Sequence, residues 1–208
     1  MLGRHHDFLV SLARASAGRR FDSVRHEEVA GGLLDLSAYR AVVWAAGETS
    51  TAHKPVNEAE QAALKAYLGS DGAVLFSGSE LLWSFSAPRG SATDLAFASE
   101  VLRAGFVADD AATFEFEGAG GSELGDVPIG SFFTPDAMRV ESPDVLAPVG
   151  GSVELLRYVG GAGGAAAVGY KGKGRVVVTG FPVESIASGA ARKAVLDAAY
   201  GFLGLAAL

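Results

Sequence analysis

The chain has 208 residues, of which 49% are hydrophobic and 20% are charged, and its formal net charge is -7. This length suits one globular domain with a substantial core, and we assign residues 1–208 to a single domain. The acidic balance and the scattered lysines and arginines argue against nucleic-acid binding. The lack of cysteine excludes disulfides, thiolate metal sites and a cysteine nucleophile.

Two further classes are excluded by the distribution of apolar residues. No apolar run approaches the roughly 18 residues that a membrane span requires. The first residues, Met1–Asp7, lack the charged-then-apolar pattern of a signal peptide. We therefore expect no membrane span, and no motif in the sequence calls for a metal or another cofactor.

The first half of the chain predicts alternating helices and strands. Apolar spacing predicts a helix over 5–17, and Phe21–Val24 is a short strand candidate. The apolar run Ala41–Ala46 is typical of a strand buried on both faces. Asn57 and Glu60 have the spacing of a capping box, which predicts the start of a helix.

The next strand is the most informative stretch of the sequence. It is apolar from Ala73 and ends abruptly in the small polar turn Ser77–Glu80. Leu81–Phe85 predicts a helix after that turn, and a further helix is expected over about 91–104. Together these elements read β-α-β-α, the order of a doubly wound α/β sheet with mostly parallel strands.

The second half departs from that alternation. Residues 106–150 are rich in Gly, Pro and Asp, and we interpret them as an irregular insertion over one edge. Three strand-like runs follow, Val153–Val159, Ala165–Tyr170 and Arg175–Thr179. Their connections are too short for crossover helices, so we expect antiparallel hairpins near the C-terminus. The final helix is expected over about 189–203.

A doubly wound domain normally opens on a strand, whereas this sequence opens on a predicted helix. The first strand is apparently missing, which suggests a fragment with a late start. Its loss would leave Phe21–Val24 and Ala41–Ala46 facing a gap, or would force those two strands to pair directly.

Three polar segments follow strands: Gly47–Thr51, Ser77–Glu80 and Gly180–Ser185. Because the carboxyl ends of parallel strands meet at one edge of a sheet, we expect them to form a shared site. The candidate ligand-binding residues are Gly47, Glu48, Ser50, Thr51, Ser77, Gly78, Trp83 and Phe181. Trp83 is the better of the two tryptophans for stacking on a sugar, since Trp44 lies in an apolar strand.

A catalytic interpretation makes Ser79 a nucleophile, Glu48 or Glu80 an acid or base, and Glu184 an orienting carboxylate. A serine nucleophile also needs a base within hydrogen-bond reach. Only His53 among the four histidines could approach the turn, and the turn does not match G-x-S-x-G. We therefore favour the structural interpretation, in which small residues form sharp turns.

Other polar motifs have ordinary structural explanations. Gly160–Gly164 joins two strands rather than a strand and a helix, which indicates a flexible hairpin turn and not a phosphate loop. Five aspartates of the insertion lack calcium-binding spacing, and such scattered carboxylates are usually solvated. They are Asp109, Asp110, Asp126, Asp136 and Asp144. The pair His5 and His6 lacks further metal ligands.

The order of these elements, with the motifs Val74–Ser79 and Val176–Glu184, resembles the class I glutamine amidotransferase-like, flavodoxin-like fold. In that family the turn after the earlier strand carries a catalytic cysteine, and the last strand ends in Phe-His-Pro-Glu. Here Ser77-Gly-Ser79 and Phe181-Pro-Val-Glu184 stand at those places. The resemblance retains the glutamate, but the departure removes the family's chemistry and predicts no glutaminase activity.

A narrower resemblance is to the amidotransferase-like domain of secreted bacterial proteins, myxobacterial ones among them, that carry names such as xanthan lyase or N-acetylmuramoyl-L-alanine amidase. Gly47–Thr51, Ser77–Glu80 with Trp83, and Val107–Asp110 look like that domain's pattern. The resemblance covers nearly the whole chain and implies an extracellular or cell-surface setting beside neighbouring domains of a larger chain.

These observations lead to two alternative functions. The first is a non-catalytic accessory or binding domain, associated with glycan or the cell wall. The second is a hydrolase that cleaves glycan or peptidoglycan amide bonds through Ser79 with Glu80 or Glu184. The geometry around Ser79 discriminates them, because a hydrolase needs a base and an oxyanion donor at one reacting centre.

Overall fold

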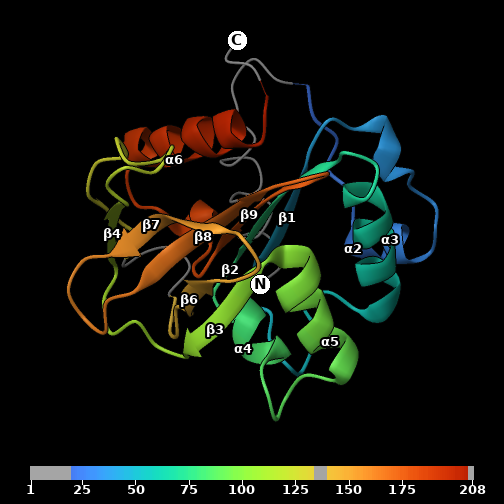
Figure 1. Cartoon of the computed structure of the whole chain (residues 1–208), viewed down its shortest axis with the longest axis horizontal. Coiled ribbons are helices and arrows are strands. Elements are labelled where there is room, and N and C mark those ends of the chain that lie inside the picture. Colours follow the sequence, from blue (N-terminus) through green and yellow to red (C-terminus); the bar gives the residue numbers. More distant parts are fainter. Residues whose placement is uncertain (1–19, 134–139, 206–208) are drawn as a thin grey trace.

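A nine-stranded mixed sheet organises the molecule in the computed structural model, which describes residues 20–133 and 140–205 (Figure 1). The main path runs β1-β2-β9-β8-β7-β4-β5, and β6 joins β3 to β8. The strands are β1 (Val42–Gly47), β2 (Ala73–Gly78), β3 (Ala104–Ala108), β4 (Glu115–Gly118), β5 (Gly130–Ser131), β6 (Val145–Pro148), β7 (Val153–Tyr158), β8 (Ala165–Lys171) and β9 (Arg175–Thr179).

Short helices and one long helix flank this sheet. They are α2 (His26–Ala30), η1 (Leu36–Ala38), α3 (Glu58–Leu68), α4 (Leu81–Phe85), α5 (Ala92–Ala96), η2 (Phe97–Leu102), η3 (Val183–Ser185) and α6 (Gly189–Phe202). The expected helices at 81–85, about 91–104 and about 189–203 are confirmed as α4, as α5 with η2, and as α6. The helix expected over 5–17 lies outside the described residues, and no helix in the described ranges is long and apolar enough to cross a membrane.

The capping-box prediction at α3 is also confirmed. Asn57 accepts hydrogen bonds from the backbone N–H groups of Ala59 and Glu60, and the Glu60 carboxylate accepts one from the Asn57 N–H at 2.7 Å. Three of the donors that a helix start leaves without intrahelical partners are thereby satisfied. The buried side of α3 then continues along Leu64 and Leu68.

Alternation along the strands divides the core between the two faces of the sheet. Val74 and Phe76 of β2 belong to the cluster that includes Leu64 of α3, whereas Leu75 belongs to the cluster that includes Leu196 of α6. This is the period of two expected of side chains in a strand. Because both faces are covered, β2 is buried along its whole length and is apolar from Ala73 to Phe76.

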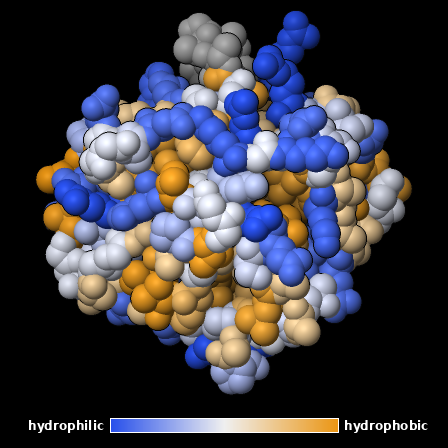
Figure 2. Space-filling view, in the orientation of Figure 1, coloured by the Kyte–Doolittle hydropathy of each residue, from blue (hydrophilic) through white to orange (hydrophobic). Residues whose placement is uncertain are grey.

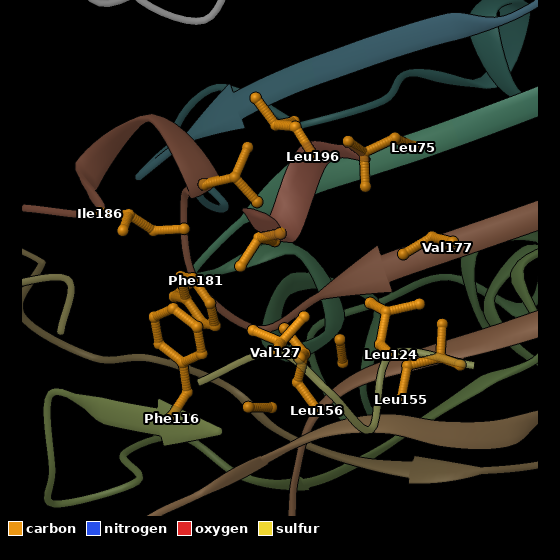
Figure 3. Close-up of a cluster of buried hydrophobic side chains, with 14 of the residues drawn as sticks. Leu75, Phe116, Leu124, Val127, Leu155, Leu156, Val177, Phe181, Ile186 and Leu196 are labelled. Atoms are coloured by element: carbon orange, nitrogen blue, oxygen red, sulfur yellow. The ribbon is translucent and has the colours of Figure 1, made fainter. Parts of the chain in front are cut away.

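The α6 face contains a compact group of aromatic rings (Figure 3). Phe181 stacks on Phe132 with ring centroids 4.5 Å apart and on Phe116 at 4.9 Å. Each of these three side chains is fully buried. Burial of such a side chain stabilises the fold by roughly 1.5–3 kcal/mol, so this cluster ties the turn after β9 to β4 and β5.

The expectation of a flavodoxin-like, mostly parallel sheet is wrong. Only the pairs β1–β2 and β2–β9 are parallel, and the other strand pairs of the described residues are antiparallel. The predicted antiparallel arrangement of β7, β8 and β9 is present. Residues 106–150 contribute β4, β5, β6 and most of β3, so they extend the sheet, and the fold is dominated by it.

The expectation of a strand at Phe21–Val24 is wrong, because this segment forms no strand and precedes α2. It therefore does not pair with Ala41–Ala46. Val42 of β1 pairs directly with Val74 of β2, and within the described residues β1 has this one neighbour.

The hairpin turn between β7 and β8 is largely exposed, but one of its glycines makes a close contact. A Cβ added at Gly161 would lie 2.1 Å from the Ala111 carbonyl oxygen, and its φ of +57° favours glycine. The N–H of Ala162 donates to the same carbonyl at 2.8 Å. Gly161 thus allows close contact with the segment before β4, and the flexibility of the turn stays a prediction.

Candidate functional site

The three parallel strands end at one edge of the sheet and bring the predicted segments together. The Ser79 N–H donates to the Gly47 carbonyl at 3.0 Å, which joins the turns after β2 and β1. The Thr179 hydroxyl donates to the carbonyls of Phe181 and Phe76, at 2.7 and 3.3 Å. The prediction that Gly47–Thr51, Ser77–Glu80 and Gly180–Glu184 share an edge is confirmed.

Ser77 and Glu184 form the centre of this edge, and they bind each other. The Ser77 hydroxyl donates to Glu184 Oε2 at 2.9 Å and accepts the Val183 N–H at 2.9 Å. Both side chains are buried. Their hydrogen bonds hold η3 against the end of β2. Ser77 and Glu184 therefore have a structural role in the protein interior.

Ser79 lacks the surroundings of a serine nucleophile. Its side chain is 1% exposed, and its Oγ has no hydrogen-bond partner among the described residues. Its φ is not positive, so the turn has no left-handed strain at this residue. His53, the histidine that the sequence placed nearest, lies in an exposed loop and does not serve as a base for Ser79 in this geometry.

Glu80 lies beside Ser79 and is partly exposed. Its Oε2 accepts a hydrogen bond from the Ser50 hydroxyl at 3.1 Å. Partial burial raises the pKa of the Glu80 carboxyl, and the charges of Asp109 and Glu48 raise it further, whereas the Ser50 hydrogen bond and Arg89 lower it. Glu48 itself is exposed and accepts the Glu141 N–H at 3.1 Å. This side of the edge is therefore acidic and reachable by solvent.

Trp83 lies on α4, one turn after Glu80. It is half-buried, and the guanidinium carbon of Arg89 lies 4.0 Å from the centroid of its ring. Trp44, by contrast, is buried, and its indole N–H donates to the Pro55 carbonyl at 2.9 Å. This agrees with the expectation that Trp44 is a core residue. Trp83 keeps part of its surface open.

The eight candidate ligand-binding residues divide by burial. Gly47, Ser77, Gly78 and Phe181 are buried, and Phe181 belongs to the aromatic stack of the core. The other four, Glu48, Ser50, Thr51 and Trp83, are partly or fully exposed. Binding by any of them stays a prediction.

The residue that sequence reasoning missed is Asp144. It was expected to be solvated, yet it is fully buried. Its N–H donates to the carbonyls of Gly180 and Ser79, at 2.8 and 3.2 Å, and its Oδ2 accepts the N–H groups of Leu82 and Trp83, at 2.8 and 3.1 Å. Asp144 thereby joins the turns after β9 and β2 to the start of α4.

The environment of Asp144 changes its acidity. Burial raises the pKa of its carboxyl well above the usual range, the two N–H donors of α4 oppose that shift, and the charges of Glu80 and Asp109 add to it. The one sequence signal for this position was its place between Pro143 and the apolar run Val145–Leu146.

The described residues contain no cluster of three or more His, Cys, Asp or Glu side chains suited to a metal ion. Asp136, His5 and His6 lie outside the described residues. A groove of about 480 Å³ lies elsewhere, between β5 and the start of α6, and is lined by Ile129, Ser131 and Ala190 among others. Figure 2 shows hydrophobic patches scattered among hydrophilic ones on one face of the molecule.

Comparison with known proteins reveals likeness of structure only. No family model matches the sequence, and no curated protein is similar to it. A β-galactosidase from Rahnella sp. R3 has 16% identity and a TM-score of 0.60, over 97% of this chain and 28% of that one. The exo-β-1,4-mannosidase Op5Man5 from Opitutaceae bacterium strain TAV5 has 17% identity and a TM-score of 0.61, over 95% and 31%.

The N-terminal domain of mmIFT52 is also similar, with 16% identity and a TM-score of 0.60 over 97% of this chain and 91% of that one. The chain thus spans less than a third of these two glycosidases but nearly all of the IFT52 domain. At this identity the likeness concerns the fold alone. The expectation of a glutamine amidotransferase-like, flavodoxin-like domain is wrong, because the strand pairing and these neighbours indicate a sheet-dominated fold that is similar to part of the two glycosidases.

Proposed function

We propose that this chain is a non-catalytic accessory or binding domain that associates with glycan, including cell-wall glycan. The observation behind this proposal is the burial of Ser79, whose hydroxyl has no base among the described residues. A hydrolase that uses Ser79 with Glu80 or Glu184 needs an accessible nucleophile with an activating partner. Glu184 is instead bonded to Ser77 inside the protein.

The glycan part of the proposal is supported by the structural neighbours and by Trp83. Two structural neighbours are a β-galactosidase and a β-mannosidase, in which the shared fold makes up 28% and 31% of the chain. An accessory role beside neighbouring domains of a larger chain agrees with those proportions. The partly exposed Trp83, beside Glu80 and Ser50, offers the aromatic and polar groups that a sugar ring prefers. The extracellular or cell-surface setting rests on the sequence resemblance alone.

The test measures binding and turnover in the same samples. Purified chain is mixed with insoluble peptidoglycan, chitin and cellulose, and both the bound fraction and the released reducing ends or amines are measured. We expect retention on at least one glycan without product release. Trp83→Ala should lower the retained fraction severalfold, since a single aromatic contact contributes roughly 1 kcal/mol.

Phe133→Ala is the matched control, because Phe133 is an exposed aromatic next to β5 whose ring contacts Phe114. Its retention should equal that of the wild type. Product release that disappears in Ser79→Ala would contradict the proposal and favour the hydrolase. Equal binding by the wild type, Trp83→Ala and Phe133→Ala would show that Trp83 does not contribute to the binding site.

A further inference from the structure

Two side-chain oxygens at the carboxyl edge are buried and have no hydrogen-bond partner within residues 20–133 and 140–205. They are Ser79 Oγ and Asp144 Oδ1, and their residues are 1% and 0% exposed. The two residues are in direct contact, because the Asp144 N–H donates to the Ser79 carbonyl at 3.2 Å. One backbone hydrogen bond therefore links the two residues that carry these buried side-chain oxygens.

Native proteins rarely leave such atoms unsatisfied, because a buried polar atom without a hydrogen bond destabilises the folded state. The remaining oxygen of Asp144 is already bonded to the N–H groups of Leu82 and Trp83. A third buried atom without a protein partner, the indole Nε1 of Trp83, belongs to a residue that already contacts the Asp144 carboxyl. The need for a further partner is thus concentrated around Asp144.

We propose that Ser79 Oγ and Asp144 Oδ1 form a binding site for one O–H group, which bridges them. An O–H group both donates and accepts, so it accepts from the Ser79 hydroxyl and forms a hydrogen bond with Asp144 Oδ1, as the donor when the carboxyl is ionised and as the acceptor when Oδ1 carries the proton. Buried water typically makes about three hydrogen bonds in sites of this kind. Because both residues are buried, the bound group is enclosed by protein.

The same chemistry has two possible sources, a water molecule or a hydroxyl of a glycan ligand. The second source rests on the proposed function, and it requires the two buried oxygens to become accessible when the ligand binds. A bare metal ion is a poorer occupant, since the described residues hold no cluster of three ligating side chains.

The sign of one mutational effect tests the site. If Oγ is hydrogen-bonded through the bridging group, Ser79→Ala lowers Tm by about 2–4 °C. If Oγ has no partner, the same substitution leaves Tm unchanged or raises it, which overturns the proposal. Ser185→Ala is the control, because Ser185 is 1% exposed and its hydroxyl donates to the Pro182 carbonyl at 2.6 Å, so its Tm should fall in either case.

A high-resolution crystal structure provides the second measurement. An oxygen peak within about 3.2 Å of both Ser79 Oγ and Asp144 Oδ1 is expected, and its absence overturns the proposal. Melting with and without saturating peptidoglycan fragments then separates the sources. A Tm increase that is larger in the wild type than in Ser79→Ala identifies a ligand hydroxyl, and an equal or absent increase identifies water. Retention on glycan without turnover is measured separately. A negative result for the O–H site can therefore be told apart from a negative result for glycan binding.

Discussion

Burial changes what the Asp144 carboxyl contributes to stability. Its pKa in the folded chain is raised above the ordinary value of 3.8, first because it is buried and then because Glu80 and Asp109 lie nearby. A raised pKa gives a stabilising contribution that is fully present below about pH 3.8. That contribution is lost as pH rises from there through the folded pKa.

Asp144→Asn removes this dependence while keeping an oxygen that accepts from Leu82 and Trp83. We expect the stability of the variant, relative to the wild type, to increase as pH rises above about 4. Urea unfolding at several pH values between 4 and 8 measures the difference. A difference that stays constant across this range would contradict the raised pKa, and Glu80→Gln is the control for the smaller shift of the neighbouring carboxyl.

At this scale the sequence predicts local chemistry but not burial. Asp109 and Asp144 belong to the same stretch rich in Gly, Pro and Asp, yet one is exposed and the other is fully buried. The difference arises from contacts of Asp144 with Ser79 and Gly180, which are distant in sequence. Contacts between residues that are distant in sequence leave no local pattern in the sequence from which burial could be predicted.

At the scale of elements, α3 depends on one buried carboxylate. Glu60 is fully buried, its Oε2 accepts the Asn57 N–H, and its Oε1 lies 2.6 Å from His26 Nδ1 of α2. The same side chain therefore completes the capping box and joins two helices. Few residues of the first turn have both roles.

We expect Glu60→Ala to destabilise the protein by about 1–3 kcal/mol, because a cap and a buried hydrogen bond are lost together. Thermal or urea unfolding measures the loss. Glu58→Ala is the matched control, because Glu58 lies in the same turn but is exposed, and its change should stay within about 0.5 kcal/mol. Equal effects of the two substitutions would show that helix propensity alone decides the outcome.

The elements predicted from local signals were largely found where the sequence placed them. The capping box at Asn57, the apolar strand from Ala73 and the amphipathic helix near the C-terminus depend on residues close in sequence. Phe21–Val24 shows the limit of that approach, since a short apolar segment becomes a strand only if a neighbour pairs with it. The pairing partners could not be predicted from spacing, so the sequence indicated a mostly parallel sheet where only the pairs β1–β2 and β2–β9 are parallel.

At the scale of the whole molecule, the exposed apolar residues near β5 stand out. Ile129 and Phe133 are 61% and 47% exposed, and Phe133 contacts Phe114 with ring centroids 5.1 Å apart. Ile129 lines the groove between β5 and α6. An apolar patch of this kind increases adhesion to hydrophobic surfaces more than it stabilises the fold.

We expect Phe133→Ser to shorten retention on a hydrophobic-interaction column and to change Tm by no more than about 2 °C. Leu33→Ser is the control, because Leu33 is 82% exposed and lies near α2 rather than in this group. A similar shortening for both variants would mean that retention follows total exposed apolar area. A large fall in Tm for Phe133→Ser would instead assign Phe133 to the core.

The position of β9 in the sheet has a consequence for the order in which the chain folds. β9 is the last strand in sequence, yet it lies between β2, to which it is parallel, and β8, to which it is antiparallel. Ala73 pairs with Arg175, so closing this contact requires a loop of about one hundred residues. During synthesis β2 therefore lacks its neighbour β9 until β9 has left the ribosome, so one edge of this apolar strand is without its native partner while about one hundred further residues are made.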